Sequence, residues 1–214
     1  MPPLPRTVKT LGAVSLLTDM SSEMIYPLLP SFLVGPLRAG PAFVGVVEGI
    51  AESVASLCRL VAGRISDRMP RRKPMIVAGY GLSSLARPLV ALAAAPWHVL
   101  AIRVADRIGK GFRGAPRDAL LAEVTPFPDL GRAFGFHRAM DHTGAVAGPL
   151  IASALLLWRP DLRLVFALAA VPAVASVLVL VLGVRESPRV VPARAAPAAK
   201  AAPLPPALRR YLFV

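Results

Sequence analysis

The hydrophobic residues of this chain fall into blocks of about twenty, separated by short polar segments. A helix rises about 1.5 Å per residue, so about 20 apolar residues cross a hydrocarbon core about 30 Å thick. The pattern therefore predicts an all-α integral membrane protein with six transmembrane helices. The expected spans are residues 11–34, 41–63, 74–94, 96–124, 132–157 and 164–184.

The composition agrees with a membrane protein and not with an ordinary soluble domain. Apolar residues make up 55% of the chain, charged residues only 17%, and the mean hydropathy is +0.60. The net charge of +13 does not predict a nucleic-acid partner, because the basic residues lie between apolar blocks and form no soluble basic face. The single Cys58 offers neither an internal disulfide nor a cysteine metal cage, and we expect no metal and no cofactor.

The distribution of basic residues predicts the orientation, because cytoplasmic loops collect Lys and Arg. Of the 25 basic residues, 14 lie on one side of the predicted spans, 3 on the other and 8 within them. We therefore expect a multi-pass protein of the plasma (inner) membrane with both termini in the cytoplasm. The start of the chain resembles a signal peptide, but Asp19 and Glu23 interrupt the apolar run, so we expect an uncleaved first span.

The composition changes after the sixth predicted span. Residues 185–206 are rich in Pro, Ala and Arg and predict a cytoplasmic linker without regular structure. Residues 207–214 resemble the start of a seventh span, and an unstructured tail is the alternative.

Ionisable residues interrupt most of the predicted spans. Such residues are costly in a bilayer, so they usually face a protein interior or a water-filled pathway. Eight acids and eight bases lie within the spans, and the sixth span has none. The first, second, fourth and fifth spans carry polar faces, which predicts that these four enclose a polar cavity while the sixth faces lipid.

Two interpretations of these charges are open: static ion pairs that hold the helices together, and a pathway for protons. Carboxylic acids in a medium of low dielectric exchange protons near neutral pH, as proton coupling requires. Histidine next to an acid can relay a proton or form a structural hydrogen bond. The candidates for proton coupling and cavity contacts are Asp19, Glu23, Glu48, Glu52, Arg103, Arg107, Asp141 and His142.

The loop after the second predicted span contains a basic motif. Gly63, Asp67, Arg68, Arg71 and Arg72 match the pattern Gly-x-x-x-Asp-Arg-x-Gly-Arg-Arg of the major facilitator superfamily, with Pro70 at the usual glycine. The resemblance implies a gate on the cytoplasmic side, in which Asp67 pairs with the fourth-span end near Arg113 or Arg117. The alternative is an ordinary positively charged cytoplasmic loop.

The fourth span is similar to a second pattern of this superfamily, Arg-x-x-Gln-Gly-x-Gly-x-Ala. Arg107, Gly111 and Ala115 match it, whereas Lys110 replaces the glutamine and Arg113 the second glycine. By resemblance, Arg107 takes part in proton transfer.

The fifth span carries small residues four apart, followed by a proline. Gly144 and Gly148 permit close helix packing, and Pro149 bends the helix. The segment resembles the antiporter signature Gly-x-x-x-Gly-Pro-x-x-Gly-Gly, with Ala152 and Ser153 in the last two positions. This resemblance favours an exporter.

Together the three motifs identify the chain as similar to the amino-terminal six-helix half of a major facilitator transporter, built from two inverted three-helix repeats. The resemblance, closest to proton-coupled drug and solute exporters of prokaryotes, implies secondary active, proton-coupled efflux by alternating access. The implied partners are a small-molecule substrate, protons, the lipid bilayer and a C-terminal six-helix half from the same gene or a separate chain.

Two alternatives stay open at this point. A half-size or truncated protein would work only as a dimer or with a partner half. An intramembrane enzyme would need a serine–histidine pair or metal ligands at membrane depth, and the sequence has neither a Gly-x-Ser-x-Gly nor a His-Glu-x-x-His motif. We therefore expect no enzyme activity.

Overall fold

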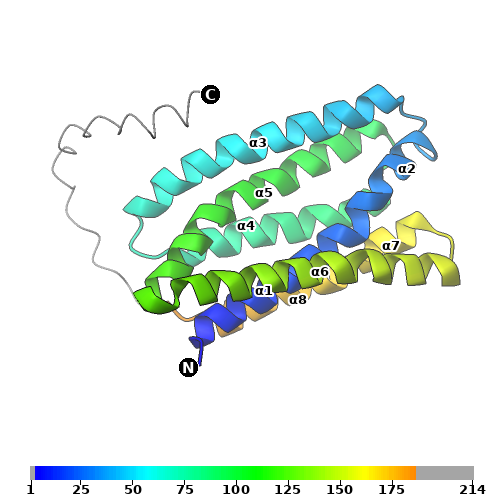
Figure 1. The fold of residues 1–214 in the computed structure, drawn as a ribbon. Coiled ribbons are helices and arrows are strands. Elements are labelled where there is room, and N and C mark those ends of the chain that lie inside the picture. Colours follow the sequence, from blue (N-terminus) through cyan, green and yellow to red (C-terminus); the bar gives the residue numbers. More distant parts are fainter. Residues whose placement is uncertain (1–2, 187–214) are drawn as a thin grey trace, which may run out of the picture.

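The computed structural model describes residues 3–186, which form helices and no strand (Figure 1). The predicted seventh-span start at 207–214 and all but the first two residues of the predicted linker lie outside this part of the chain. The helices are α1 (Arg6–Ile25), η1 (Tyr26–Leu28), α2 (Leu29–Val34), α3 (Pro41–Arg68), α4 (Lys73–Ala86), η2 (Arg87–Leu92), α5 (Pro96–Glu123), η3 (Phe127–Asp129), α6 (Leu130–Trp158), α7 (Leu162–Leu168) and α8 (Ala170–Gly183).

Within residues 3–186, three helical segments are long and apolar enough to cross a membrane. They are Lys73–Leu92, Phe127–Trp158 and Leu162–Gly183, which correspond to the third, fifth and sixth predicted spans. The α1, α3 and α5 helices are more polar because they carry most of the acids and bases. Their charged faces therefore need protein partners or water within the bundle.

Prolines set several helix boundaries. The α3 and α5 helices begin at Pro41 and Pro96, where a missing N–H costs no helical hydrogen bond, and both starts were predicted. Pro27 instead lies where the first predicted span changes from α1 into η1, because proline cannot donate the next helical bond. The α3 helix continues to Arg68, beyond the predicted end at residue 63.

The helices pack in an open arrangement that leaves one face uncovered within the described residues. The α5 helix packs along α3 and α4, α1 packs along α6 and α8, and contacts between α4 and α8 join the two groups. Figure 1 shows α3 and α6 at opposite edges of this face. The start of α1, the α3–α4 turn, the α5–α6 turn and the end of α8 lie at one end of the bundle.

Two buried apolar clusters lie at the two ends of the bundle. Near one end, Phe32 of α2 meets Phe166 of α7 edge to face, with ring centroids 5.1 Å apart. At the other end, Leu11, Tyr80 and Leu180 join α1, α4 and α8. The stretch of α5 between the two clusters carries the buried charges.

Glycines allow α1 and α6 to approach each other closely. A Cβ atom added at Gly148 would lie 2.7 Å from the carbonyl oxygen of Met20, and one added at Gly144 would collide with the carbonyl of Leu16. The structure thus places both glycines, which the spacing singled out, where two helix backbones touch.

We expect Gly144→Ala to destabilise the bundle, because the added methyl group forces α1 away from α6. Gly135→Ala is the matched control in the same helix, where an added Cβ meets no atom within 4 Å. Since alanine is favoured over glycine by about 1 kcal/mol in a helix interior, the control should keep or raise the unfolding temperature. Thermal unfolding in detergent measures both, and equal shifts for the two variants would contradict the packing role.

Candidate functional site

A buried ion pair joins the third predicted span to the fourth. Arg87 Nε donates to Asp106 Oδ1 at 2.9 Å, and only 2% of Arg87 and 1% of Asp106 are exposed. Arg87 Nη1 also donates to the carbonyl of Thr18 at 2.9 Å, and the Tyr26 hydroxyl donates to Asp106. Arg87, the one charge of the third predicted span, therefore connects η2 with α5, α1 and η1.

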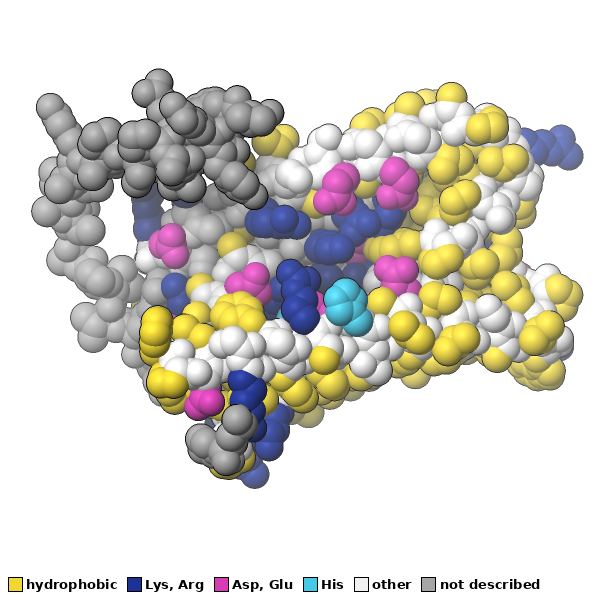
Figure 2. Space-filling model, in the orientation of Figure 1, with side chains coloured by type: hydrophobic (Ala, Val, Ile, Leu, Met, Phe, Trp, Pro, Cys, Tyr) yellow, Lys and Arg dark blue, Asp and Glu magenta, His cyan; other side chains and the backbone are white. Residues whose placement is uncertain are grey.

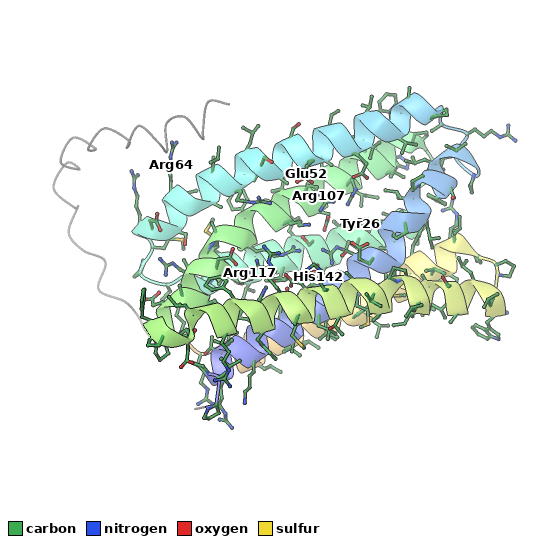
Figure 3. The ribbon with its side chains drawn as sticks, viewed as in Figure 1. Tyr26, Glu52, Arg64, Arg107, Arg117 and His142 are labelled. Carbon is green, nitrogen blue, oxygen red and sulfur yellow. The ribbon has the colours of Figure 1, made fainter. Side chains whose placement is uncertain are left out.

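A second network links α3 and α5 on the uncovered face. Arg103 forms a bidentate pair with Glu48, with Nε–Oε1 and Nη2–Oε2 distances of 3.0 and 2.6 Å. One turn further, Arg107 Nε lies 3.8 Å from Glu52, and Figure 3 shows these side chains between the two helices. The ring of Tyr26 lies under both guanidinium groups, 3.7 Å from that of Arg103 and 5.2 Å from that of Arg107.

Further along α5, Arg113 is buried without a carboxylate partner among the described residues. Its Nη1 donates to Ser83 Oγ at 2.6 Å, and its guanidinium lies 4.5 Å from the ring centroid of Tyr80. Ser83 in turn donates to the Asp106 carbonyl at 3.0 Å. A hydroxyl and an aromatic face thus hold a full positive charge in place.

Asp141 connects α6 with α1. The Ser15 hydroxyl donates to its carboxylate, while His137 Nδ1 and Arg138 Nη1 each lie 3.6 Å away. His142 is exposed on α6 and faces the same side of the bundle as Tyr26 and Arg107 (Figure 3). Glu23, half-buried on α1, has its Cβ close to the space that a side chain at Gly148 would need.

A polar cavity of about 380 Å³ lies in the half of the bundle that is nearer to the start of α1. Figure 2 shows basic side chains gathered in a hollow on the uncovered face, with acidic side chains at its edges and apolar ones around it. The lining comes from α1, α3, α5 and α6, the four helices predicted to enclose a cavity, and from Tyr80 of α4. The lining residues are Ser15, Thr18, Asp19, Arg59, Tyr80, Lys110, Arg113, Gly114, Ala115, Arg117, Asp118, Arg138 and Asp141.

The structure thus places eight of the predicted site residues in two groups. Asp19, Arg113, Arg117 and Asp141 share the cavity, whereas Glu48, Glu52, Arg103 and Arg107 form the neighbouring α3–α5 network. Sequence reasoning missed the partners Ser15, Tyr26 and Ser83. For two of them the available signal was position: Ser15 lies four residues before Asp19 on α1, and Ser83 of α4 lies four residues before Arg87 of η2.

The loop motif is organised around Arg72, which is only 7% exposed. Arg72 Nη1 donates to Glu123 at the end of α5 at 2.6 Å, its Nε donates to Ser66 at 3.3 Å, and its Nη2 lies 3.8 Å from Asp67. Asp67 thus forms an ion pair with Arg72 at the α3–α4 turn. Arg113 and Arg117, the partners that the resemblance implied, donate to Ser83 and Asp118.

The other residues of the loop motif differ in their surroundings. An added Cβ at Gly63 would lie 3.8 Å from Ala115 of α5, an ordinary packing distance. Arg68 and Arg71 are exposed. The motif therefore contains one buried arginine that joins helices and several basic side chains directed to solvent.

A second set of contacts ties the start of α4 to the end of α8. The Glu186 carboxylate accepts hydrogen bonds from the backbone N–H groups of Arg72 and Lys73, both at 2.7 Å. Lys73 Nζ donates to the carbonyls of Val181 and Val184 at 2.8 and 2.6 Å. An acid thus lies at the helix N-terminus and a base at the helix C-terminus, as the two helix dipoles favour.

Residues 11–214 match the family model of the Major Facilitator Superfamily. The chain belongs to the Major Facilitator Superfamily. It is therefore a multi-pass membrane protein of a transporter family, as the loop and helix motifs predicted.

Relatives of this superfamily member include proteins of archaea and bacteria. It is 37% identical over 155 residues to an uncharacterised MFS-type transporter of Methanocaldococcus jannaschii, covering 72% of this chain and 38% of the relative. It is 33% identical over 155 residues to the multidrug resistance protein MdtH of Proteus mirabilis, covering 70% of this chain and 38% of the relative. The chain thus spans less than half the length of these relatives.

Solved structures share the fold. A bacterial homologue of the human lysosomal transporter Spinster, in an inward-facing and occupied conformation, superposes with a TM-score of 0.74 at 20% identity, covering 85% of this chain and 44% of that one. A POT family transporter in complex with 5-aminolevulinic acid gives a TM-score of 0.75 at 16% identity, covering 83% and 38%. At these identities the likeness shows the major facilitator fold alone.

We expect Arg72→Ala to loosen the end of the bundle, because it removes the bonds to Ser66 and Glu123. A charge-assisted hydrogen bond is worth about 1.5–3 kcal/mol, so amide exchange at the start of α4 should become at least about tenfold faster. Arg71→Ala is the matched control, since Arg71 is the exposed neighbour. Hydrogen–deuterium exchange that is unchanged in Arg72→Ala would favour an ordinary basic loop.

Proposed function

We propose that this chain is one six-helix bundle of a secondary active transporter, and that the transporter exports a small solute by proton-coupled alternating access. The observation that carries the proposal is the polar cavity between α1, α3, α5 and α6, which is lined by Asp19 and Asp141. Apolar packing alone would hold helices together without these charges. Ionisable residues kept at this depth favour a pathway.

The six-span arrangement is supported by the way in which the polar helices are placed. The helices α1, α3 and α5 turn their charges toward one another and toward the uncovered face, while α8 presents apolar side chains such as Val174, Leu178 and Leu182 outward. In such transporters two bundles rock about a site near the midplane. The uncovered polar face suits a second bundle, a C-terminal half from the same gene or a separate chain.

A second copy of this bundle is the alternative partner for that face. Such a dimer would be a half-size transporter, and the uncovered position of the cavity between α3 and α6 favours either arrangement over a single bundle that acts alone.

Asp19 and Asp141 are the proposed proton carriers. Both line the cavity, and Asp19 has no ion pair within 4.0 Å among the described residues, so a proton can bind it without breaking a salt bridge. Arg107, to which the family resemblance assigns proton transfer, lies beside Glu52 and keeps its Nε–H without a hydrogen-bond acceptor among the described residues. This donor remains available to water or to Glu52.

The direction and the location of transport rest on three observations. The antiporter-like segment at Gly144, Gly148 and Pro149 and the similarity to a multidrug resistance protein favour export. The exposed bases Arg64, Arg68 and Arg71 lie at the end of the bundle that also holds the start of α1 and the end of α8. The enrichment of basic residues on the cytoplasmic side supports the proposal that both termini are cytoplasmic, and the proposed location is the plasma (inner) membrane.

The contacts of Arg72 are the proposed cytoplasmic gate. They join the ends of α3 and α5, the two helices that border one side of the cavity, to the start of α4. Breaking the Arg72–Glu123 pair would let these ends separate.

We expect Asp19→Asn and Asp141→Asn to abolish uphill transport while the protein stays in the membrane, because an amide cannot carry the proton. Everted membrane vesicles from cells that express the gene, energised by proton pumping, are offered a panel of fluorescent anions, neutral compounds and cations. Wild-type vesicles should accumulate at least one of them, and Asp129→Asn, at the surface turn before α6, should behave as wild type. Wild-type accumulation rates in both aspartate variants would refute the coupling assignment.

A further inference from the structure

We infer that the cavity binds a small organic anion. This inference rests on the proposed function, because it takes the polar cavity to be the substrate site. It adds the charge of the substrate, which neither the family nor the fold assigns.

The cavity wall carries more positive than negative groups. Five bases and three acids line it, an excess of two positive charges. The bases are Arg59, Lys110, Arg113, Arg117 and Arg138, and the acids are Asp19, Asp118 and Asp141.

The ion pairs within the cavity wall leave the excess positive charge on the side formed by α3 and α5. Arg117 pairs with Asp118 at 2.8 Å, and Arg138 lies 3.6 Å from Asp141. Among the described residues, no carboxylate lies within 4.0 Å of the other three bases, Arg59 of α3 and Lys110 and Arg113 of α5. Asp19, across the cavity on α1, is the one lining acid left, so two positive charges stay uncompensated even if it offsets one.

Arg113 is 96% buried. Its hydrogen bond goes to a neutral hydroxyl and its other neighbour is an aromatic ring, so no formal negative charge within ion-pair distance balances it. A buried unpaired charge is costly in a low-dielectric surrounding, and a bound anion lowers that cost. The same field repels a cationic solute.

Two of these three bases are the positions at which α5 departs from the pattern that it resembles. Lys110 stands at the glutamine of that pattern and Arg113 at a glycine. The positive charge of the cavity is therefore a property of this chain and not of the motif. Guanidinium and ammonium groups bind carboxylate, sulfonate and phosphate oxygens through charge-assisted hydrogen bonds.

The negative charge also agrees with the proposed direction. An anion that leaves a cell interior with a negative membrane potential moves down the electrical gradient. The cavity volume of about 380 Å³ lies within the usual range for small-molecule sites.

The test compares three solutes that share one ring system and differ in charge: 1-naphthalenesulfonate, 1-naphthalenemethanol and 1-naphthylmethylammonium. Equilibrium dialysis against the purified full-length protein in a non-ionic detergent measures the binding of each. We expect the sulfonate to bind at least about tenfold more tightly than the ammonium compound.

Lys110→Gln and Arg59→Gln should each weaken sulfonate binding by about five- to tenfold, because each removes one unpaired charge. Arg64→Gln is the matched control on α3, since Figure 3 shows Arg64 directed away from the cavity. Arg113 is left unchanged because its substitution would also remove the bonds that it makes inside the bundle.

Tighter binding of the ammonium compound, no binding of the sulfonate, or sulfonate binding unchanged in both cavity variants would overturn the inference. An anionic lipid headgroup offers the same charge, so displacement of the sulfonate by excess phosphatidylglycerol would overturn its assignment to a soluble anion. Vesicle transport separates this inference from the proposed function. Uphill accumulation of a cation alone would refute the anionic substrate and support the transport function. Sulfonate binding without transport of any solute would support the anion site and refute the transport function.

Discussion

The structure depends on the compensation of the charges that α5 carries through the middle of the bundle. Arg87 and Asp106 form the central ion pair, and no more than 2% of either residue is exposed to solvent. Removing one partner of such a pair leaves an unpaired buried charge and costs about 3–5 kcal/mol. Because Arg87 also holds the Thr18 carbonyl, and Tyr26 holds Asp106, one ion pair fixes the relative positions of α1, η1, η2 and α5.

From this centre the charges differ in how completely they are paired. Toward α3, Arg103 and Arg107 meet Glu48 and Glu52 in register, one turn apart on both helices. In the cavity, by contrast, bases outnumber acids and several have no acid partner. The paired charges hold polar helices together, and the partly paired ones lie in the cavity, where an anionic solute can supply the missing negative charge. This division supports a transport role better than a purely structural one.

The sequence predicted the parts of the fold that depend on local physics. Pro41 and Pro96 begin helices where the apolar blocks begin, and the charge-free block after Leu164 lies in α7 and α8. Helical spacing also predicted which helices contribute to the cavity. The break between α7 and α8 at Ala169 and the change of α4 into η2 were missed, although each lies near a proline that cannot donate a helical hydrogen bond, Pro172 in the first turn of α8 and Pro88 in η2.

The side-chain partners could not be derived from the sequence. Ser15 and Asp141 are 126 positions apart, and Tyr26 and Asp106 are 80 apart, so their contacts follow from helix packing alone. The proposed gate is a similar case. Asp67 and Arg72 were both identified, but the partner of Arg72 on α5 is Glu123, which lies 51 positions away in the chain.

If this bundle belongs to a transporter as proposed, its polar face lines a water-filled pathway while its apolar face contacts lipid. A thiol reacts with a maleimide as the thiolate, which forms in water and not in hydrocarbon. The decisive measurement labels Gly114→Cys, on the cavity wall with no atom within 4 Å of its Cβ position, and Leu178→Cys, on the outward face of α8. Both are made in a Cys58→Ala background and treated with a membrane-impermeant maleimide in everted vesicles. We expect rapid labelling at position 114 and none at position 178. Labelling at 178 with protection at 114 would contradict a water-filled pathway on the polar face.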